Sequence, residues 1–556
     1  MFQKNESHRQ SSFFGLAEQL PKSKKEKLEK SKEYSFYQLI FRHIDEGLFK
    51  VLYSDIASRP NAPVNTLVAS IILMYHHGWT CEELFNQIDF NLLTRAALGL
   101  DDLDNTPFCP ATFFNFQNRL HSYYVETGDN LLEKVFDPLT ETQLKKLKIK
   151  TDIQRSDSFM AMSNIASYGR TQLLIEVLIR LYRILTEADK NYCKELLQPY
   201  TKQTSGQYLY KLDRSDIPKE QEKLAQIYHQ LYQAFQPSYG ATSVFQIFER
   251  VYQEHFEVVS DKILVRDSKT LNGSILQSPD DLDATYRSKN GKHFRGQSVN
   301  VTETAHPENA LNLITDVAVC SNNTDDSEIL NKRIEGMKTK TEDLSELHTD
   351  GAYGSAANDE KMESHKITHV QTAVRGRKAE VTIKLEEEKK GVYVVSCPNQ
   401  QVKSKKTNKR DKACFDLEIC NQCDLQISCP AKKQKKHAAY YFKHSDYLQY
   451  KRNHNINEIS YERRKIRPNI EATVKEFTKA FNHKGKLRVR GQFKAMIFAV
   501  AMAIAINHGR IYRKMHQNPT FFSILKNVKQ NIFSFLFYKE NFIIFPTNPL
   551  KLKLSI

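Results

Sequence analysis

The hydrophobic period of the chain changes from helical to alternating near residue 294, and this change is the strongest constraint on the fold. Apolar and polar residues alternate at 294–302, and a second apolar run at 313–319 follows a turn-like segment at 306–309. This pattern predicts a β-hairpin. A helical stretch at 327–340 and a short strand that ends before Asp350 come next. Strands that are interleaved with helices predict an α/β sheet.

Two other blocks of the chain repeat apolar residues at helical spacing. Residues 35–120 do so, with Thr80 placed to cap a helix, and residues 165–260 form a second helical block. The segment 110–120 sets aromatic residues beside a basic end, which fits either a helix-turn-helix that reads DNA or a helix bundle that only packs. We therefore expect an all-helical N-terminal domain and a helical insertion.

The balance of charges indicates the kind of partner. The chain has 556 residues, enough for several domains, and its 81 Lys and Arg against 65 Asp and Glu give a net charge of +16. Such an excess favours a polyanion, with nucleic acid the first candidate. The longest apolar run, 495–506, is shorter than the roughly 20 residues that a membrane span needs. These features predict a cytoplasmic protein, and 40 % hydrophobic residues exclude wholesale disorder.

Acidic residues beside predicted elements are the candidate catalytic groups. Asp157 and Asp350 each follow a strand-like run, so we expect both at strand ends, and Glu471 lies in the first turn of a predicted helix. The carboxyl ends of strands in an open α/β sheet meet at one crevice. Cleavage of a phosphodiester on two divalent ions needs carboxylates from separate elements. Asp152 and Asp267 also end strand-like runs, so the choice of the first aspartate stays open.

Five of the nine cysteines fall between Cys397 and Cys429. In a reducing compartment such a cluster favours a metal clip over disulfides. Cys397, Cys420, Cys423 and Cys429 supply enough thiolates for a four-coordinate structural Zn²⁺, with Cys414 left over; reduced thiols packed in a small knob are the alternative. Lysine-rich runs at 403–412 and 432–436 are either solvated faces or surfaces that follow DNA phosphates.

Five stretches together resemble the bacterial insertion-sequence transposases of the DDE type, in the group with an InsH-like N-terminal domain. They lie, in the order of that family, at 59–85, 154–178, 277–304, 347–355 and 467–477. The resemblance implies an RNase H-like catalytic core, a mixed sheet flanked by helices, that cleaves DNA and transfers its strands. It also implies two Mg²⁺ (or Mn²⁺) ions, double-stranded DNA of the transposon ends and the target as partner, and a homodimer on DNA.

Carried over residue by residue, the resemblance assigns the metal-binding acids to Asp157, Asp350 and Glu471. The DNA contacts that we expect around the glutamate are Tyr461, Arg464, Arg467, Lys475 and Lys479. The family signature is stretched here. Arg467 keeps its spacing to Glu471, but Tyr461 lies farther off and the usual lysine position holds Thr478, so Lys475 or Lys479 is expected to take its place.

These features predict six parts. They are a basic N-terminal arm (1–33), a helical InsH-like DNA-binding domain (34–125), the first part of the core (145–375) with the helical insertion at about 165–260, a Cys- and Lys-rich insertion (376–455), the rest of the core with the glutamate helix (456–515), and a tail (516–556). Two other functions stay open: a catalytically decayed or domesticated DNA-binding descendant, and a host nuclease with the RNase H-like fold. Cleavage of specific ends and strand transfer distinguish a transposase from both.

Overall fold

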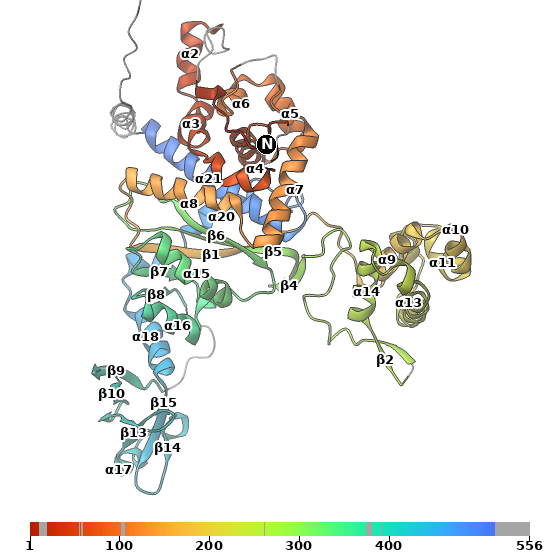
Figure 1. Ribbon diagram of the computed structural model, residues 1–556. Coiled ribbons are helices and arrows are strands. Elements are labelled where there is room, and N and C mark those ends of the chain that lie inside the picture. The colour runs from red at the N-terminus through yellow and green to blue at the C-terminus, as the bar shows by residue number, and fades with distance from the viewer. Residues whose placement is uncertain are drawn as a thin grey trace, which may run out of the picture.

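A mixed β-sheet forms the centre of the molecule (Figure 1). The computed structural model describes residues 1–9, 19–54, 56, 59–101, 106–260, 262–373, 381–389 and 391–517. Neighbouring strands are, in order, β6 (Ile314–Ser321), β5 (Lys292–Thr304), β1 (Ile153–Met162), β7 (Glu346–Thr349) and β8 (Thr368–Gln371). β1, β7 and β8 are parallel, β5 is antiparallel to β1 and β6, and β4 (Thr285–Lys289) pairs with the start of β5. The arrangement is consistent with the RNase H-like core that the resemblance implies, and the predicted hairpin is confirmed.

Strand β1 corrects one expectation, because Asp157 lies in the middle of a strand rather than at its end. The strand continues through this polar segment because its side chains find partners inside the sheet. Ser156 Oγ lies 2.6 Å from Thr302 Oγ1, and Asn300 Nδ2 donates to Ser158 Oγ at 3.1 Å. Helix α8 (Leu131–Lys146) precedes this strand in the chain.

Helices cover both faces of the sheet. Helices α8, α20 (Ile470–Thr478) and α21 (Gln492–Gln517) pack on one face, where Phe159 and Val301 join their apolar core. Helices α15 (Asp326–Lys340) and α16 (Ala356–Ser364) cover the other face. By length and composition α21 could cross a membrane, but 83 % of its apolar window is buried inside the structure, as expected of a core helix.

The N-terminal region is helical and packs on α21. Thr80 forms a capping box at the start of α5, as predicted, and α7 buries Phe113, Phe116 and Leu120 as a member of a bundle. The basic run at 22–32 is helical, and α2 within it has no buried residue. The elements are η1 (Ser7–Arg9), α2 (Lys22–Glu29), α3 (Lys32–Leu39), η2 (Phe41–His43), η3 (Glu46–Leu52), α4 (Val64–His77), α5 (Cys81–Phe90), α6 (Leu92–Ala97) and α7 (Pro110–Thr127).

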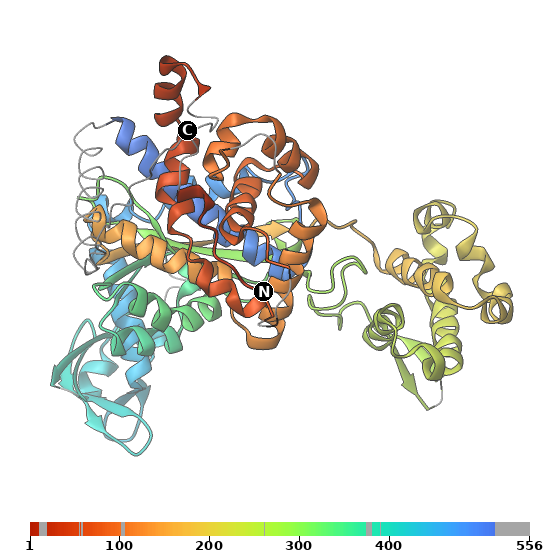
Figure 2. The same ribbon diagram turned by 45° about the horizontal axis from the view of Figure 1, so that its top comes forward.

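A helical lobe leaves the sheet after β1 and returns at β4 (Figure 2). It has an apolar core of its own, which includes Leu178, Tyr228 and Phe248. The lobe begins and ends close to the limits predicted for the helical insertion. Its elements are α9 (Arg170–Ile184), α10 (Glu187–Tyr192), α11 (Lys194–Thr201), α12 (Ser205–Tyr210), η4 (Arg214–Asp216), α13 (Ile217–Tyr239), α14 (Ser243–His255) and the hairpin of β2 (Phe256–Val259) and β3 (Lys262–Val265).

A second, smaller unit, here called the Cys knob, lies between β8 and α20. One of its sheets joins β9 (Lys384–Lys389), β10 (Val392–Ser396) and β11 (Gln401–Lys403); the other joins β12 (Lys405–Lys406), β13 (Asp411–Phe415), β15 (Ala438–Phe442) and β14 (Lys432–Lys433). Helix α17 (Leu417–Asn421) and η6 (Gln426–Ser428) connect β13 to β14, and α18 (His444–Glu458) and α19 (Tyr461–Arg464) lead to α20. The predicted tail lies outside the described residues from 518 onward.

Candidate active site

Three carboxylates from distant parts of the chain meet around one guanidinium group. Arg467 Nη2 lies 2.8 Å from Asp157 Oδ2 and 3.8 Å from Asp350 Oδ2, and Arg467 Nη1 lies 3.6 Å from Glu471 Oε1. The exposed fraction of the acidic side chains rises from 13 % for Asp157 through 33 % for Asp350 to 65 % for Glu471. The acids therefore form a site that is closed at the sheet and open to solvent at the helix.

Each acid is placed by a different element. Asp157 is in the middle of β1, on the face that α20 covers. Asp350 follows β7, the parallel neighbour of β1, and caps η5 (Gly351–Tyr353), where its Oδ1 accepts a hydrogen bond of 2.8 Å from Ala352 N. Glu471 is in the first turn of α20. The side chains are thus brought together by the pairing of β1 with β7 and by the docking of α20.

The site carries more negative than positive charge. Burial raises the pKa of Asp157 above its ordinary value, although the Arg467 guanidinium acts in the opposite direction. Asp326, the first residue of α15, is 6 % exposed, and its Oδ1 accepts no hydrogen bond. Burial raises the pKa of Asp326 as well, and the negative charge of Asp350 adds to this. Added positive charge therefore stabilises the site.

The two alternative acids lie elsewhere. Asp152 precedes β1, and its Oδ2 is 3.7 Å from His306 Nε2. Asp267 follows β3 in the helical lobe, where its carboxylate accepts a hydrogen bond from Lys269 N. Neither has an ion pair with Arg467 among the described residues, so the structure gathers Asp157 with Asp350 and Glu471.

A buried ion cluster holds α20 against the sheet. Glu303 on β5 is fully buried and lies 2.6 Å from Arg155 Nη2 and 2.7 Å from Arg510 Nη1. Thr473 on α20 donates a hydrogen bond of 2.7 Å to the same carboxylate. Arg155 also donates to the carbonyl of Ile466, the residue before Arg467. Burial would raise the pKa of Glu303, but Arg510 and Arg155 outweigh it and hold that pKa below its ordinary value.

A second network joins the two aspartate-bearing elements behind the site. Tyr353 is fully buried, and its hydroxyl lies 2.7 Å from Ser158 Oγ and accepts a hydrogen bond of 2.6 Å from Asn300 Nδ2. Sequence reasoning did not select these residues or the Glu303 cluster. In the sequence, the one feature that could have indicated them is that polar residues occur in predicted strands whose other residues are apolar.

Four of the five residues predicted to contact DNA are exposed. Tyr461, Arg464, Lys475 and Lys479 are exposed on α19, on α20 or at its end. Lys465 Nζ lies 4.2 Å from the centre of the Tyr461 ring. Arg467 differs, because its guanidinium is 17 % exposed and is already paired with acids.

Two regions of the chain match models of known protein families. Residues 23–119 match the transposase domain DUF772, and residues 392–512, which include Glu471 and α20, match the transposase DDE domain. Both matched models describe transposases, which supports a DDE-type insertion-sequence transposase. Such a transposase has DNA as its partner and is a DNA-cutting and joining enzyme. No curated protein and no solved structure matches the chain.

Transposases of this type generally use divalent ions such as Mg²⁺. The ligand chemistry of the acid site fits, because carboxylate oxygens suit Mg²⁺ and the three acids already face one cationic group, the Arg467 guanidinium. Within the described ranges, however, no three His, Cys, Asp or Glu side chains stand close enough together to hold a metal ion as they are. Arg467 lies between these acids, so it competes with a metal ion for them.

Proposed function

We propose that this transposase binds the terminal inverted repeats of an insertion sequence and catalyses metal-dependent cleavage and strand transfer with Asp157, Asp350 and Glu471. The observation that carries the proposal is the meeting of these three carboxylates at Arg467. Acids from a central strand, a neighbouring strand end and a helix are the set that a two-ion site for phosphodiester chemistry needs.

The three acids would hold two Mg²⁺ or Mn²⁺ ions. When bound, such ions stabilise the attacking and the leaving oxygens of the phosphoryl group. Arg467 would balance the negative charge while the ions are absent. An ion among the carboxylates would weaken the attraction between the acids and Arg467, which leaves the guanidinium available for a DNA phosphate.

The Cys knob offers a second surface for DNA. Lys405 and Lys412 lie directly opposite one another on β12 and β13, and like charges in this position destabilise a sheet unless a counter-charge is present. Arg410 and Lys412 also lie over the ring of Tyr441, at 4.7 and 5.6 Å from its centre. A DNA backbone supplies the missing negative charge, and exposed lysines at 432–436 extend the surface.

Joining two transposon ends requires two active sites in one complex, so we propose a homodimer on DNA. Because the proposed substrate is the chromosomal DNA of a bacterium, we expect the enzyme to act in the cytoplasm, at the nucleoid. The two other functions make different demands. A decayed or domesticated copy binds ends without cutting them, and a host nuclease cuts without regard to end sequence.

The test uses the DNA that flanks the gene. Short inverted repeats there provide the end duplexes, and scrambled duplexes of the same composition are the control. The full chain with Mg²⁺ is expected to cut at the ends of the repeats and to join them to target DNA, and to do neither with scrambled DNA. Binding without cleavage, or equal cleavage of both duplexes, rejects the proposal in favour of one of the alternatives.

A further inference from the structure

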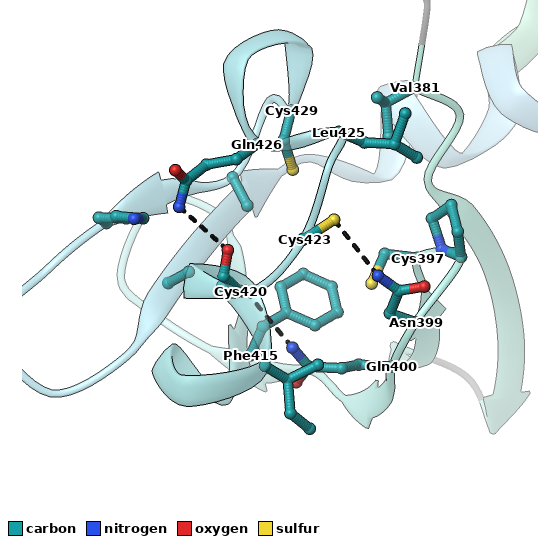
Figure 3. Close-up of a pocket in the computed structure, with 15 residues that line it drawn as sticks. Val381, Cys397, Asn399, Gln400, Phe415, Cys420, Cys423, Leu425, Gln426 and Cys429 are labelled. Carbon is teal, nitrogen blue, oxygen red and sulfur yellow. Dashed lines mark hydrogen bonds between the residues drawn. The ribbon is translucent and has the colours of Figure 1, made fainter.

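We propose that the Cys knob binds one structural Zn²⁺ through Cys397, Cys420, Cys423 and Cys429. The four residues come from three separate segments of the knob and line one pocket of about 260 Å³. Figure 3 shows the sulfurs of Cys397, Cys423 and Cys429 around the same space. The fifth cysteine, Cys414, lies on β13 and does not line the pocket. The structure thus separates four candidate ligands from the odd one.

Two of the four sulfurs already receive the kind of hydrogen bond that stabilises a thiolate. Asn399 Nδ2 donates to Cys423 Sγ at 3.3 Å, and Gln400 Nε2 donates to Cys420 Sγ at 3.4 Å. Both donors belong to the turn that begins at Cys397, whose own N–H donates to the Gln400 carbonyl at 2.8 Å. Amide donors next to the sulfur ligands of a metal stabilise the thiolate form and fix the ligand orientation.

The segment that carries three of the cysteines has little apolar support. Between residues 416 and 431, which include α17 and η6, no residue is buried, and Ile427 is completely exposed. The apolar core of the knob is small, with eight buried residues on β9, β10, β13, β15 and next to β9. Small units with so little apolar burial are commonly held by a metal or by disulfides. All described cysteines are free thiols, so the Cys knob is not held by disulfides.

Zinc binding requires the four sulfur atoms to move closer together. As placed, the thiols are not yet at metal-ligand distance within the described ranges. Each thiol releases its proton to solvent on binding, and four thiolates with one Zn²⁺ carry a net charge of about −2. Lys433 lines the same pocket, and the surrounding strands carry further lysines, so the charge of the complex has a positive environment. The soft sulfur donors select Zn²⁺ over Mg²⁺.

The experiment measures metal in the purified full chain without DNA, so it does not depend on the proposed cleavage activity. Zinc per chain is determined by elemental analysis for the wild type, Cys397→Ser, Cys423→Ser and the matched control Cys414→Ser. We expect about one Zn²⁺ per chain in the wild type and the control and a loss of about tenfold or more in the other two. Replacement of Zn²⁺ by Co²⁺ is expected to give the absorption of tetrahedral cobalt thiolate.

A second measurement uses only the wild-type protein, so it tests the proposal even if a cysteine variant fails to fold. Chelation of the wild-type protein is expected to speed proteolytic cleavage within 416–431 and to leave the helical lobe protected. The proposal is overturned if the wild type contains no zinc and its proteolysis does not respond to the chelator. It is also overturned if Cys414→Ser loses as much zinc as Cys423→Ser, or if iron replaces zinc in the elemental analysis.

Discussion

The hydroxyl of Tyr353 lies 2.7 Å from Ser158 Oγ and joins the strand that carries Asp157 to the turn that carries Asp350. Both residues are next to or near a proposed catalytic acid, and Tyr353 is fully buried. The hydrogen bond therefore links the two aspartate-bearing segments on the face of the sheet that α15 and α16 cover. Tyr353 acts as a positioning residue in this arrangement.

Replacing Tyr353 with Phe tests this role. The change removes one hydroxyl and leaves Asn300 and Ser158 with unsatisfied hydrogen-bonding groups, which costs about 1–3 kcal/mol. We expect a lower rate of single-turnover DNA cleavage with DNA affinity nearly unchanged, because Tyr353 is fully buried and cannot contact DNA directly. Tyr210→Phe, at a residue that is 92 % exposed, is the control. Equal cleavage rates for the two variants would show that the hydrogen bond does not position the acids.

The Glu303 cluster is expected to dominate the local stability of α20. Glu303→Gln removes the negative charge that pairs with the buried Arg155 and with Arg510, which is 14 % exposed and also pairs with Glu476. Removing one partner of a buried ion pair costs about 3–5 kcal/mol. Urea unfolding measures the loss. Glu308→Gln, whose ion pair with Lys150 is exposed, serves as the control and is expected to change stability by less than about 0.5 kcal/mol. A similar loss in both variants contradicts the anchoring role.

Stability is expected to fall in mild acid because of His508. Burial, with Lys32 and His76 nearby, lowers the pKa of His508 to about 3 from an ordinary value of 6.5. The unfolded chain therefore binds more protons between pH 6.5 and 3, and stability decreases as pH falls through this window by about 1.4 kcal/mol per pH unit. His508→Gln should flatten the change in unfolding free energy between pH 7 and pH 5 by about 2 kcal/mol. The exposed His483→Gln is the control, and an unchanged slope in His508→Gln contradicts the prediction.

Lys475 and Lys479 are expected to contact phosphates without reading bases. Alanine at both positions should weaken binding to end and scrambled duplexes alike. It should also reduce the slope of log affinity against log salt by about 0.9 per lost contact. The exposed Lys145→Ala, whose side chain pairs with Glu141, is the control. A loss of affinity for end duplexes alone would indicate base contacts instead.

Much of the site could be predicted because two of its acids lie at the ends of secondary-structure elements that the sequence pattern predicts. Asp350 follows a strand-like run and Glu471 lies in the first turn of an amphipathic helix, so local pattern alone places both near the sheet. Asp157 is different, since its polar neighbours argue for the end of a strand. The strand continues only because Ser156 and Ser158 bond to residues of β5, and a local pattern does not reveal such partners.

The Glu303 cluster and the contacts of Arg467 could not be predicted from the sequence for a related reason. Arg155 and Glu303 are separated by 148 residues and become partners only through the register of β1 with β5. A one-residue change in that register would place them on opposite faces. The contact of Arg467 with all three acids likewise depends on where α20 docks, which sequence spacing does not specify.

The most direct test of the acid site compares amide variants in one assay. Cleavage of end duplexes is measured under single-turnover conditions with Mg²⁺ for the variants Asp157→Asn, Asp350→Asn and Glu471→Gln. The variants Asp152→Asn and Asp267→Asn are the controls. DNA binding is measured for all five. We predict a loss of cleavage of at least about a hundredfold in the first three, near wild-type cleavage in the controls, and binding within a few-fold throughout. Near wild-type cleavage by any of the first three, or an equal loss in a control, would contradict the assignment of these acids.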